Sequence, residues 1–172
     1  GSAQSQQFLI FGLSRFIGIK PLQLVYSGAF CGGGFGSKGG PYAEMSIPAH
    51  MSKKLGGRAV MMRISREEEH YIGKGRPGFQ GKVKIGFRRD GRILACDMYI
   101  VHENGPNTGL WDFRNAGTSF SIVFQPEAMR WQGISVLTNT SVRGPQRGPG
   151  ENQTAAAMEP IIAQAARKLG LD

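Results

Sequence analysis

The sequence predicts an α+β fold, with a mixed sheet of short strands, one long hairpin and about three helices. Apolar residues recur at helical spacing near both ends of the chain, whereas residues 79–101 alternate between apolar and polar. Glycine-rich stretches separate these segments and supply the turns between them.

Three segments are predicted to be helices. Gln4–Phe16 carries a broad apolar face, and Gly18 follows at the place where a helix would end. Tyr42–Leu55 is closed by two consecutive glycines. Gln153–Leu169 follows a glycine-rich turn near the C-terminus.

A hairpin is predicted from the alternation of apolar and polar residues over 79–101. Val83 faces one side of its first strand, the neighbouring lysines face the other, and Arg89-Asp90-Gly91 supplies the turn. Cys96 alternates with apolar neighbours and is expected in the core. His102 stands just past the hairpin and is predicted to be a surface or capping histidine.

The remaining segments are shorter and less regular. Arg66–His70 is predicted to be a solvated turn rather than a metal site. Glu103–Thr118 is predicted to be a long loop, in which Trp111 and Phe113 are expected to pack over a site or to contact another domain. Further short strands are predicted at Leu22–Tyr26, Ala59–Ile64, Ile122–Phe124 and Gly133–Leu137.

Composition limits the partners of this 172-residue chain. Its formal net charge of +9 admits three interpretations: solubility within a larger assembly, nucleic-acid binding, or a basic groove for a phosphorylated cofactor. The basic residues are scattered and do not cluster with aromatic residues, which disfavours nucleic acid. No run is long and apolar enough to span a membrane, so no membrane partner is expected.

The two cysteines, Cys31 and Cys96, are not part of a C-x-x-C pair, so this chain is not expected to hold structural zinc or an iron–sulfur cluster. So few cysteines fit a reducing compartment, and a cytoplasmic location is predicted, with the periplasm as the alternative. Cys31 adjoins a glycine run, where core packing is expected and contact with a ligand of the loop is the alternative.

The glycine run between Tyr26 and Pro41 is the first candidate site. Seven of its residues are glycine, and it links a predicted strand to a predicted helix. Such loops hold anionic or polar ligands on free backbone N–H groups, although a flexible linker is the alternative. A P-loop is excluded because Ser37 separates Gly36 from Lys38, and the dinucleotide fingerprint lacks its acidic partner about 20 residues on.

The second candidate site is the stretch Thr138–Gln153, which holds two Gly-Pro pairs and two arginines. This turn leads to the N-terminus of a predicted helix, which is a ready site for an anion. A simple strand-to-helix turn with solvent-facing arginines is the alternative.

Taken together, the two loops resemble those of the molybdenum hydroxylases, the xanthine dehydrogenase and aldehyde oxidase family. Gly32–Lys38 is similar to the family's G-G-G-F-G-x-K loop, and Thr138–Gln153 to its T-N-…-R-G-x-G-x-x-Q segment. The hairpin and the last helix resemble the family segments between and after these loops. The resemblance covers nearly the whole chain from Gln4.

The resemblance implies a molybdopterin-binding-domain-like fold and a molybdenum–molybdopterin cofactor, expected in its cytosine dinucleotide form. It implies that Phe35 and Arg147 contact substrate. It also implies a set of cofactor-binding residues that includes these two: Gly33, Gly34, Phe35, Gly36, Gln146 and Arg147.

The reaction that the resemblance implies is hydroxylation of an aldehyde or N-heterocycle with water as the oxygen source. Gly39 stands where some members carry a substrate-contacting glutamate, which disfavours a purine. Iron–sulfur clusters and FAD are expected on other domains or subunits, and the essential glutamate downstream of this chain.

Gly1 and Ser2 resemble a tag remnant, so residues 3–172 are expected to be one fragment of the cofactor-binding domain, truncated at both ends and inactive alone. The partners would be the rest of the large subunit and the iron–sulfur and flavin subunits. The alternative is a non-catalytic basic domain that binds a nucleotide or nucleic acid.

Overall fold

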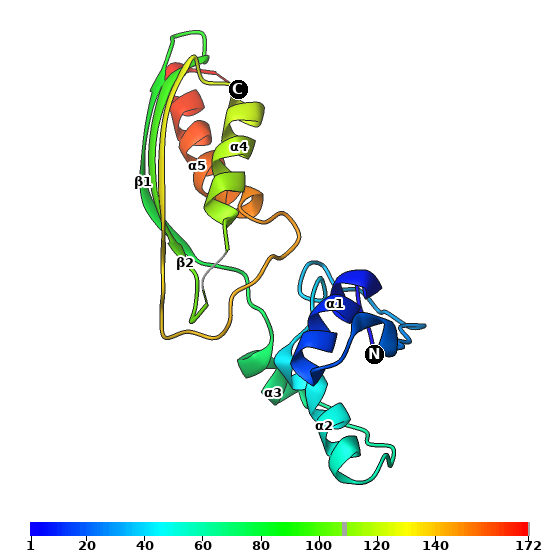
Figure 1. Ribbon diagram of the computed structural model, residues 1–172. Helices are drawn as coiled ribbons and strands as arrows, with labels where there is room; N and C mark the ends of the chain where they lie inside the picture. The colour runs from blue at the N-terminus through cyan, green and yellow to red at the C-terminus, as the bar shows by residue number, and fades with distance from the viewer. Residues whose placement is uncertain (108–109, 172) are drawn as a thin grey trace. The chain divides into compact units, whose positions relative to one another are not determined.

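The computed structural model describes residues 1–107 and 110–171. Contacts between residues divide the chain into two units, Gly1–Gly73 and Lys74–Asp172, and each is described by itself (Figure 1). None of the helices formed by the described residues is long and apolar enough to cross a membrane.

The first unit begins with helix α1, Gln6–Ile17, as predicted. The Ser5 hydroxyl accepts a hydrogen bond from the Phe8 N–H at 3.4 Å, and Gly18 ends the helix with a φ of 79°. Leu9 and Leu13 are buried on the inner face. The helix predicted at Tyr42–Leu55 is a 3₁₀ turn, η2 (Ala43–Ser46), followed by α2 (Ile47–Lys54).

Two predicted strands of this unit are not formed. Leu22–Tyr26 begins within a short 3₁₀ turn, η1 (Pro21–Gln23), and continues without regular structure, and Ala59–Ile64 is irregular throughout. Both predictions are wrong, and Leu22, Val25 and Met61 are each more than 90% exposed. The apolar pattern is that of a strand, but a strand also needs a neighbour, and the described part of this unit offers none.

The charged segment predicted as a solvated turn forms a short exposed helix, α3 (Arg66–Ile72). The Ser65 hydroxyl accepts the Glu68 N–H at 3.2 Å, and the Glu68 carboxylate accepts the Ser65 N–H at 2.7 Å. This capping box, rather than any buried face, stabilises the helix.

The second unit is a three-stranded sheet covered by two helices. The predicted hairpin is confirmed as β1 (Phe79–Phe87) and β2 (Ile93–Glu103), which pair antiparallel. β3 (Ala128–Val136) pairs parallel with β2, so the sheet is mixed and has the order β1-β2-β3. The α+β prediction is therefore confirmed.

Helices α4 (Asp112–Phe124) and α5 (Glu151–Leu169) lie side by side along this sheet (Figure 1). α5 begins two residues earlier than predicted. The fully or nearly buried core draws on β2, α4 and α5, and consists of Cys96, Met98, Ile100, Phe120 and Met158. Cys96 therefore lies in the core as predicted.

The prediction missed α4. Glu103–Thr118 is predicted to be a loop and Ile122–Phe124 a strand, and both predictions are wrong over the residues that form this helix. Gly117 obscured the helical pattern, yet it is required there, because an added Cβ would lie 2.8 Å from the Trp131 ring on β3. With α3 and α4, the described residues form five α-helices rather than about three.

Two single-residue predictions are corrected as well. His102 is fully buried, with its Nδ1 atom 3.0 Å from the Ser135 hydroxyl and its ring centroid 5.3 Å from that of Phe79. β2 runs two residues further than predicted, so its inward alternation reaches His102. Cys31 was expected to pack in a core but is exposed, because the chain around it forms no regular element.

Candidate functional site

The first glycine loop has a backbone that side chains would disturb. Gly33 and Gly36 have φ values of 107° and 115°, and Phe35 has a φ of 51°, which is uncommon for a residue other than glycine. A Cβ at Gly33 would lie 2.8 Å from the Phe35 ring. The sequence therefore needs glycine here to let the chain turn closely around the Phe35 side chain.

Gln4 fixes this loop from 32 residues away. Its side-chain oxygen accepts hydrogen bonds from the Gly36 N–H at 2.8 Å and the Lys38 N–H at 3.1 Å, and its own N–H donates to the Lys38 carbonyl at 3.0 Å. A Cβ at Gly34 would lie 2.4 Å from the Gln4 side chain. Sequence reasoning placed Gln4 only at the start of a helix and missed this contact.

These contacts decide which donors of the first loop remain available. The N–H groups of Gly36 and Lys38 are taken by Gln4, and the Ser37 N–H donates to the Gly34 carbonyl at 2.9 Å. The N–H groups of Gly33, Gly34 and Phe35 make no hydrogen bond within the described residues. The Phe35 ring is 62% exposed beside them.

The second loop joins β3 to α5, and packing forces its glycines. Gly148 and Gly150 have φ values of 70° and 90°. A Cβ at Gly150 would lie 2.0 Å from the carbonyl oxygen of Asp112, in the first turn of α4. Only glycine lets α5 begin this close to α4.

Arg76 holds the centre of the second loop. Its two terminal nitrogens donate to successive carbonyls, Nη2 to Arg147 at 2.6 Å and Nη1 to Gly148 at 3.0 Å. The Arg147 side chain itself is exposed and makes no hydrogen bond or ion pair with the described residues. Gln146 is engaged differently, because its Nε2 donates to the Lys74 carbonyl at 2.7 Å.

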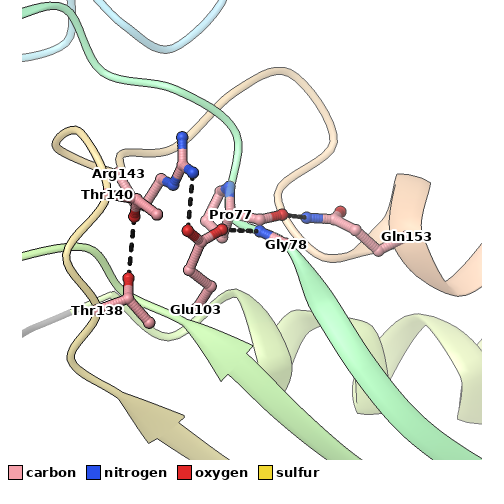
Figure 2. A network of polar contacts seen from close by, with 7 residues as sticks. All are labelled: Pro77, Gly78, Glu103, Thr138, Thr140, Arg143 and Gln153. Atoms are coloured by element: carbon pink, nitrogen blue, oxygen red, sulfur yellow. Dashed lines mark hydrogen bonds and ion pairs between the residues drawn. The ribbon is translucent and has the colours of Figure 1, made fainter. Parts of the chain in front are cut away.

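An ion pair supports the same loop at its other end. Figure 2 shows Glu103, at the end of β2, between Arg143 of the loop and the backbone of Gly78. The carboxylate lies 2.7 Å from Arg143 Nη2 and accepts the Gly78 N–H at 3.0 Å. Both side chains of the pair are about four-fifths buried.

The charge on Glu103 is strongly favoured in the folded protein. The hydrogen bond from Arg143 is the main cause that lowers the pKa of Glu103 to about 2, and hydrogen bonds from Thr140 and the Gly78 backbone add to it. Glu103 is therefore an ionised anchor at neutral pH, and it was not recognised from the sequence because its partner lies 40 residues away.

Each loop can be tested for its fit to an anionic cofactor. The first loop offers the three free N–H groups of Gly33, Gly34 and Phe35, and the second offers the Gly148 N–H and the Arg147 guanidinium. Bare main chain with free donors suits the oxygen atoms of an anion, because they can approach without meeting a side chain. The donor set therefore fits a molybdopterin group, loop by loop.

Known proteins are similar to this chain in sequence and in fold. The family model described as "Molybdopterin cofactor-binding domain" matches residues 1–172. Aldehyde oxidase 1 of Rattus norvegicus is 30% identical over 142 residues, which cover 81% of this chain and 11% of that protein. Aldehyde oxidoreductase of Megalodesulfovibrio gigas is 30% identical over 166 residues, which cover 95% of this chain and 18% of that protein.

Among solved structures, quinoline 2-oxidoreductase from Pseudomonas putida 86 matches with a TM-score of 0.87 and 26% identity. The match covers 99% of this chain and 22% of that one, so the chain spans about a fifth or less of the relatives named here. The chain belongs to the molybdopterin cofactor-binding domain family, of the xanthine dehydrogenase and aldehyde oxidase type.

Proposed function

We propose that this chain is a piece of the molybdenum-cofactor-binding subunit of an oxidoreductase that hydroxylates an aldehyde or an N-heterocycle, with water as the oxygen source. The observation that carries the proposal is that a side chain of its own unit hydrogen-bonds the backbone of each glycine-rich loop, yet each loop leaves main-chain donors free within the described residues. Family membership makes a molybdopterin group the natural ligand of these donors.

The residues of the first loop have distinct roles in this proposal. The N–H groups of Gly33, Gly34 and Phe35 donate to cofactor oxygens. Gly36 contributes the absence of a side chain rather than a donor, because its N–H is bound to Gln4. The exposed Phe35 ring forms an apolar wall beside the substrate.

The second loop supplies charge. The Arg147 guanidinium presents donors to a carbonyl or anionic group of the substrate or to the cofactor. Gln146 contributes its side-chain oxygen, since its amide nitrogen donates to Lys74. When bound, the cofactor would supply the oxygen transfer and accept the electrons, and the residues of this chain would orient it and the substrate.

The rest of the enzyme lies outside these 172 residues in our proposal. A catalytic glutamate, iron–sulfur clusters and FAD belong to other parts of the subunit or to partner subunits, and the cofactor is the cytosine dinucleotide form. The domain given by residues 3–172 is then a fragment, inactive on its own. We place the enzyme in the cytoplasm, which fits a chain with two free cysteines.

The test is Arg147→Ala in the full-length enzyme. We expect kcat/KM to fall by about a hundredfold or more, as for the loss of one charged contact in a preorganised site, with molybdenum and pterin content retained. Arg89→Ala is the matched control, because Arg89 is an exposed arginine of the hairpin turn. Unchanged kinetics would remove Arg147 from the site.

A second measurement tests the proposal as a whole. Full-length protein purified from a host that makes the cofactor should contain molybdenum and pterin. Absence of both, together with salt-dependent binding of mixed DNA, would instead support the basic nucleotide- or nucleic-acid-binding domain.

A further inference from the structure

The segment Lys74–Gly78 runs beside the second loop and is bonded along its whole length. The Lys74 carbonyl accepts from Gln146, and the Pro77 carbonyl accepts from Gln153 at 3.0 Å. The Gly75 N–H donates to the Val142 carbonyl at 2.9 Å, and its carbonyl accepts the Gly144 N–H at 3.1 Å. The Gly78 N–H donates to Glu103, which pairs with Arg143 (Figure 2).

Arg76 lies at the centre of this segment and binds two successive peptide carbonyls of the second loop. Its guanidinium donates to the carbonyls of Arg147 and Gly148. The Asn152 side-chain amide, from the first turn of α5, also donates to the Arg147 carbonyl at 3.4 Å. The Arg147 carbonyl is therefore fixed from two directions.

The direction of this carbonyl also sets the direction of a donor. The described chain has no cis peptide bond, and in a trans peptide the C=O and the following N–H point in opposite directions. Because Arg76 turns the Arg147 carbonyl toward itself, the Gly148 N–H points away from Arg76. This N–H has no acceptor in the part of the chain that the structure describes, and the next residue, Pro149, has no N–H to offer.

We infer that Arg76 is a positioning residue, which orients the Gly148 N–H and the base of the Arg147 side chain toward the ligand of the second loop. The inference rests on the proposed function for the identity of that ligand. The orientation itself does not depend on that identity, because it follows from the contacts that Arg76 makes with the Arg147 and Gly148 carbonyls, together with the weaker contact of Asn152.

Lysine could not replace arginine in this role. A guanidinium presents parallel N–H groups from one rigid plane, so it can serve two neighbouring carbonyls at once, whereas an ammonium is a single point of donation. Arg76 also carries its charge next to the buried carboxyl of Asp112, where it partly offsets the rise that burial causes in the pKa of that acid. The two hydrogen bonds to the loop carbonyls and the attraction to the Asp112 carboxyl both favour this position of the guanidinium.

The first experiment measures backbone amide hydrogen exchange in the full-length enzyme, for wild type, Arg76→Lys, Arg76→Gln and the control Arg89→Ala. We expect peptides that span residues 142–152 to exchange at least about tenfold faster in both Arg76 variants, since each loses a charge-assisted hydrogen bond. Arg89→Ala should leave them unchanged. Unchanged exchange in Arg76→Lys and Arg76→Gln would overturn the inference, whatever the activity.

The second experiment separates positioning from general stability by a double-mutant cycle of Arg76→Lys with Arg147→Ala. If Arg76 acts through the second loop, Arg76→Lys lowers kcat/KM at least about tenfold in the wild type and by much less in the Arg147→Ala background. An equal loss in both backgrounds would contradict positioning of Arg147. Failure of the proposed function looks different: Arg147→Ala alone would then leave kcat/KM intact, while the exchange result with Arg76 variants would stand.

Discussion

Gly150→Ala is expected to destabilise the second unit strongly. Gly150 has a φ of 90° and a ψ of −38°, a conformation that costs a residue with a side chain about 1–3 kcal/mol. Its new Cβ would also lie 2.0 Å from the Asp112 carbonyl oxygen and 2.8 Å from the Ala116 nitrogen. Both atoms belong to the backbone of α4 and cannot rotate away, so overpacking adds about 1–3 kcal/mol.

The sum predicts a loss of about 2–6 kcal/mol in the free energy of unfolding, a large part of the stability of an ordinary domain. The lower entropy of alanine in the unfolded chain returns at most about 1 kcal/mol. Urea unfolding followed by circular dichroism measures the loss, and hydrogen exchange shows whether α4 and the start of α5 open together.

Two other glycines separate the causes of this loss. Gly170→Ala places an alanine where the backbone already has a φ of 70°, with no atom within 4 Å of the new Cβ. It should lower the free energy of unfolding by about 1 kcal/mol. Gly86→Ala, on β1, has neither a positive φ nor a neighbour and should change stability by less than about 1 kcal/mol. If Gly150→Ala costs no more than Gly170→Ala, the close approach of α5 to α4 is wrong.

Three further predictions concern the anchors and the pH dependence of stability. Gln4→Ala removes the acceptor of two loop amides and should speed exchange in peptides of residues 33–39 about tenfold, without affecting the second unit. Glu103→Gln should destabilise the second unit by about 1–3 kcal/mol at pH 7. The pKa of Glu103 is lowered in the folded state, so this difference is complete above about pH 4.5 and shrinks as the pH falls toward 2, which urea unfolding across that range measures. Burial lowers the pKa of His102, so below pH 6.5 the unfolded state takes up a proton on this imidazole more readily than the folded state. The free energy of unfolding should therefore decline as the pH falls below 6.5, and an NMR titration of the folded protein should place the His102 midpoint below 6.5.

The hairpin could be predicted because its information is local. Alternation along β1 and β2 and the turn between them lie within about 25 consecutive residues, and Cys96 follows from the same pattern. His102 could have been found in the same way, since it continues the series of buried residues at 96, 98 and 100. The error came from ending the strand too early, not from missing information.

Other elements depend on neighbours that a local pattern cannot show. Ala59–Ile64 has the composition of a buried strand, but pairing needs a second strand, which the described residues do not place beside it. In α4 a helix forms where a loop and a strand are predicted. Ala116 and Phe120 give it a buried face, and packing of this face on β2 and β3 stabilises the helix despite Gly117. In both cases tertiary context overrides the local preference.

The candidate site also has features that the sequence shows locally and features that depend on distant residues. Glycine runs mark the two loops in the sequence, because few other roles need so many residues without side chains. The residues that make these loops rigid are far away along the chain, with separations of 32 residues for Gln4 and 71 for Arg76. No spacing rule connects a long polar side chain to a backbone amide at such a distance.

This division has a physical basis. A glycine-rich loop loses more conformational entropy on folding than any other, so free donors alone would fluctuate and bind an anion weakly. Gln4 occupies the N–H groups of Gly36 and Lys38, and Arg76 occupies the carbonyls of Arg147 and Gly148. In each loop the anchored groups fix the peptide planes, so the protein itself sets the orientation of the remaining N–H groups. Under the proposed function, a loop whose anchor is removed should keep its N–H donors but bind the anionic cofactor more weakly. That result would distinguish preorganisation of the donors from the mere presence of glycine.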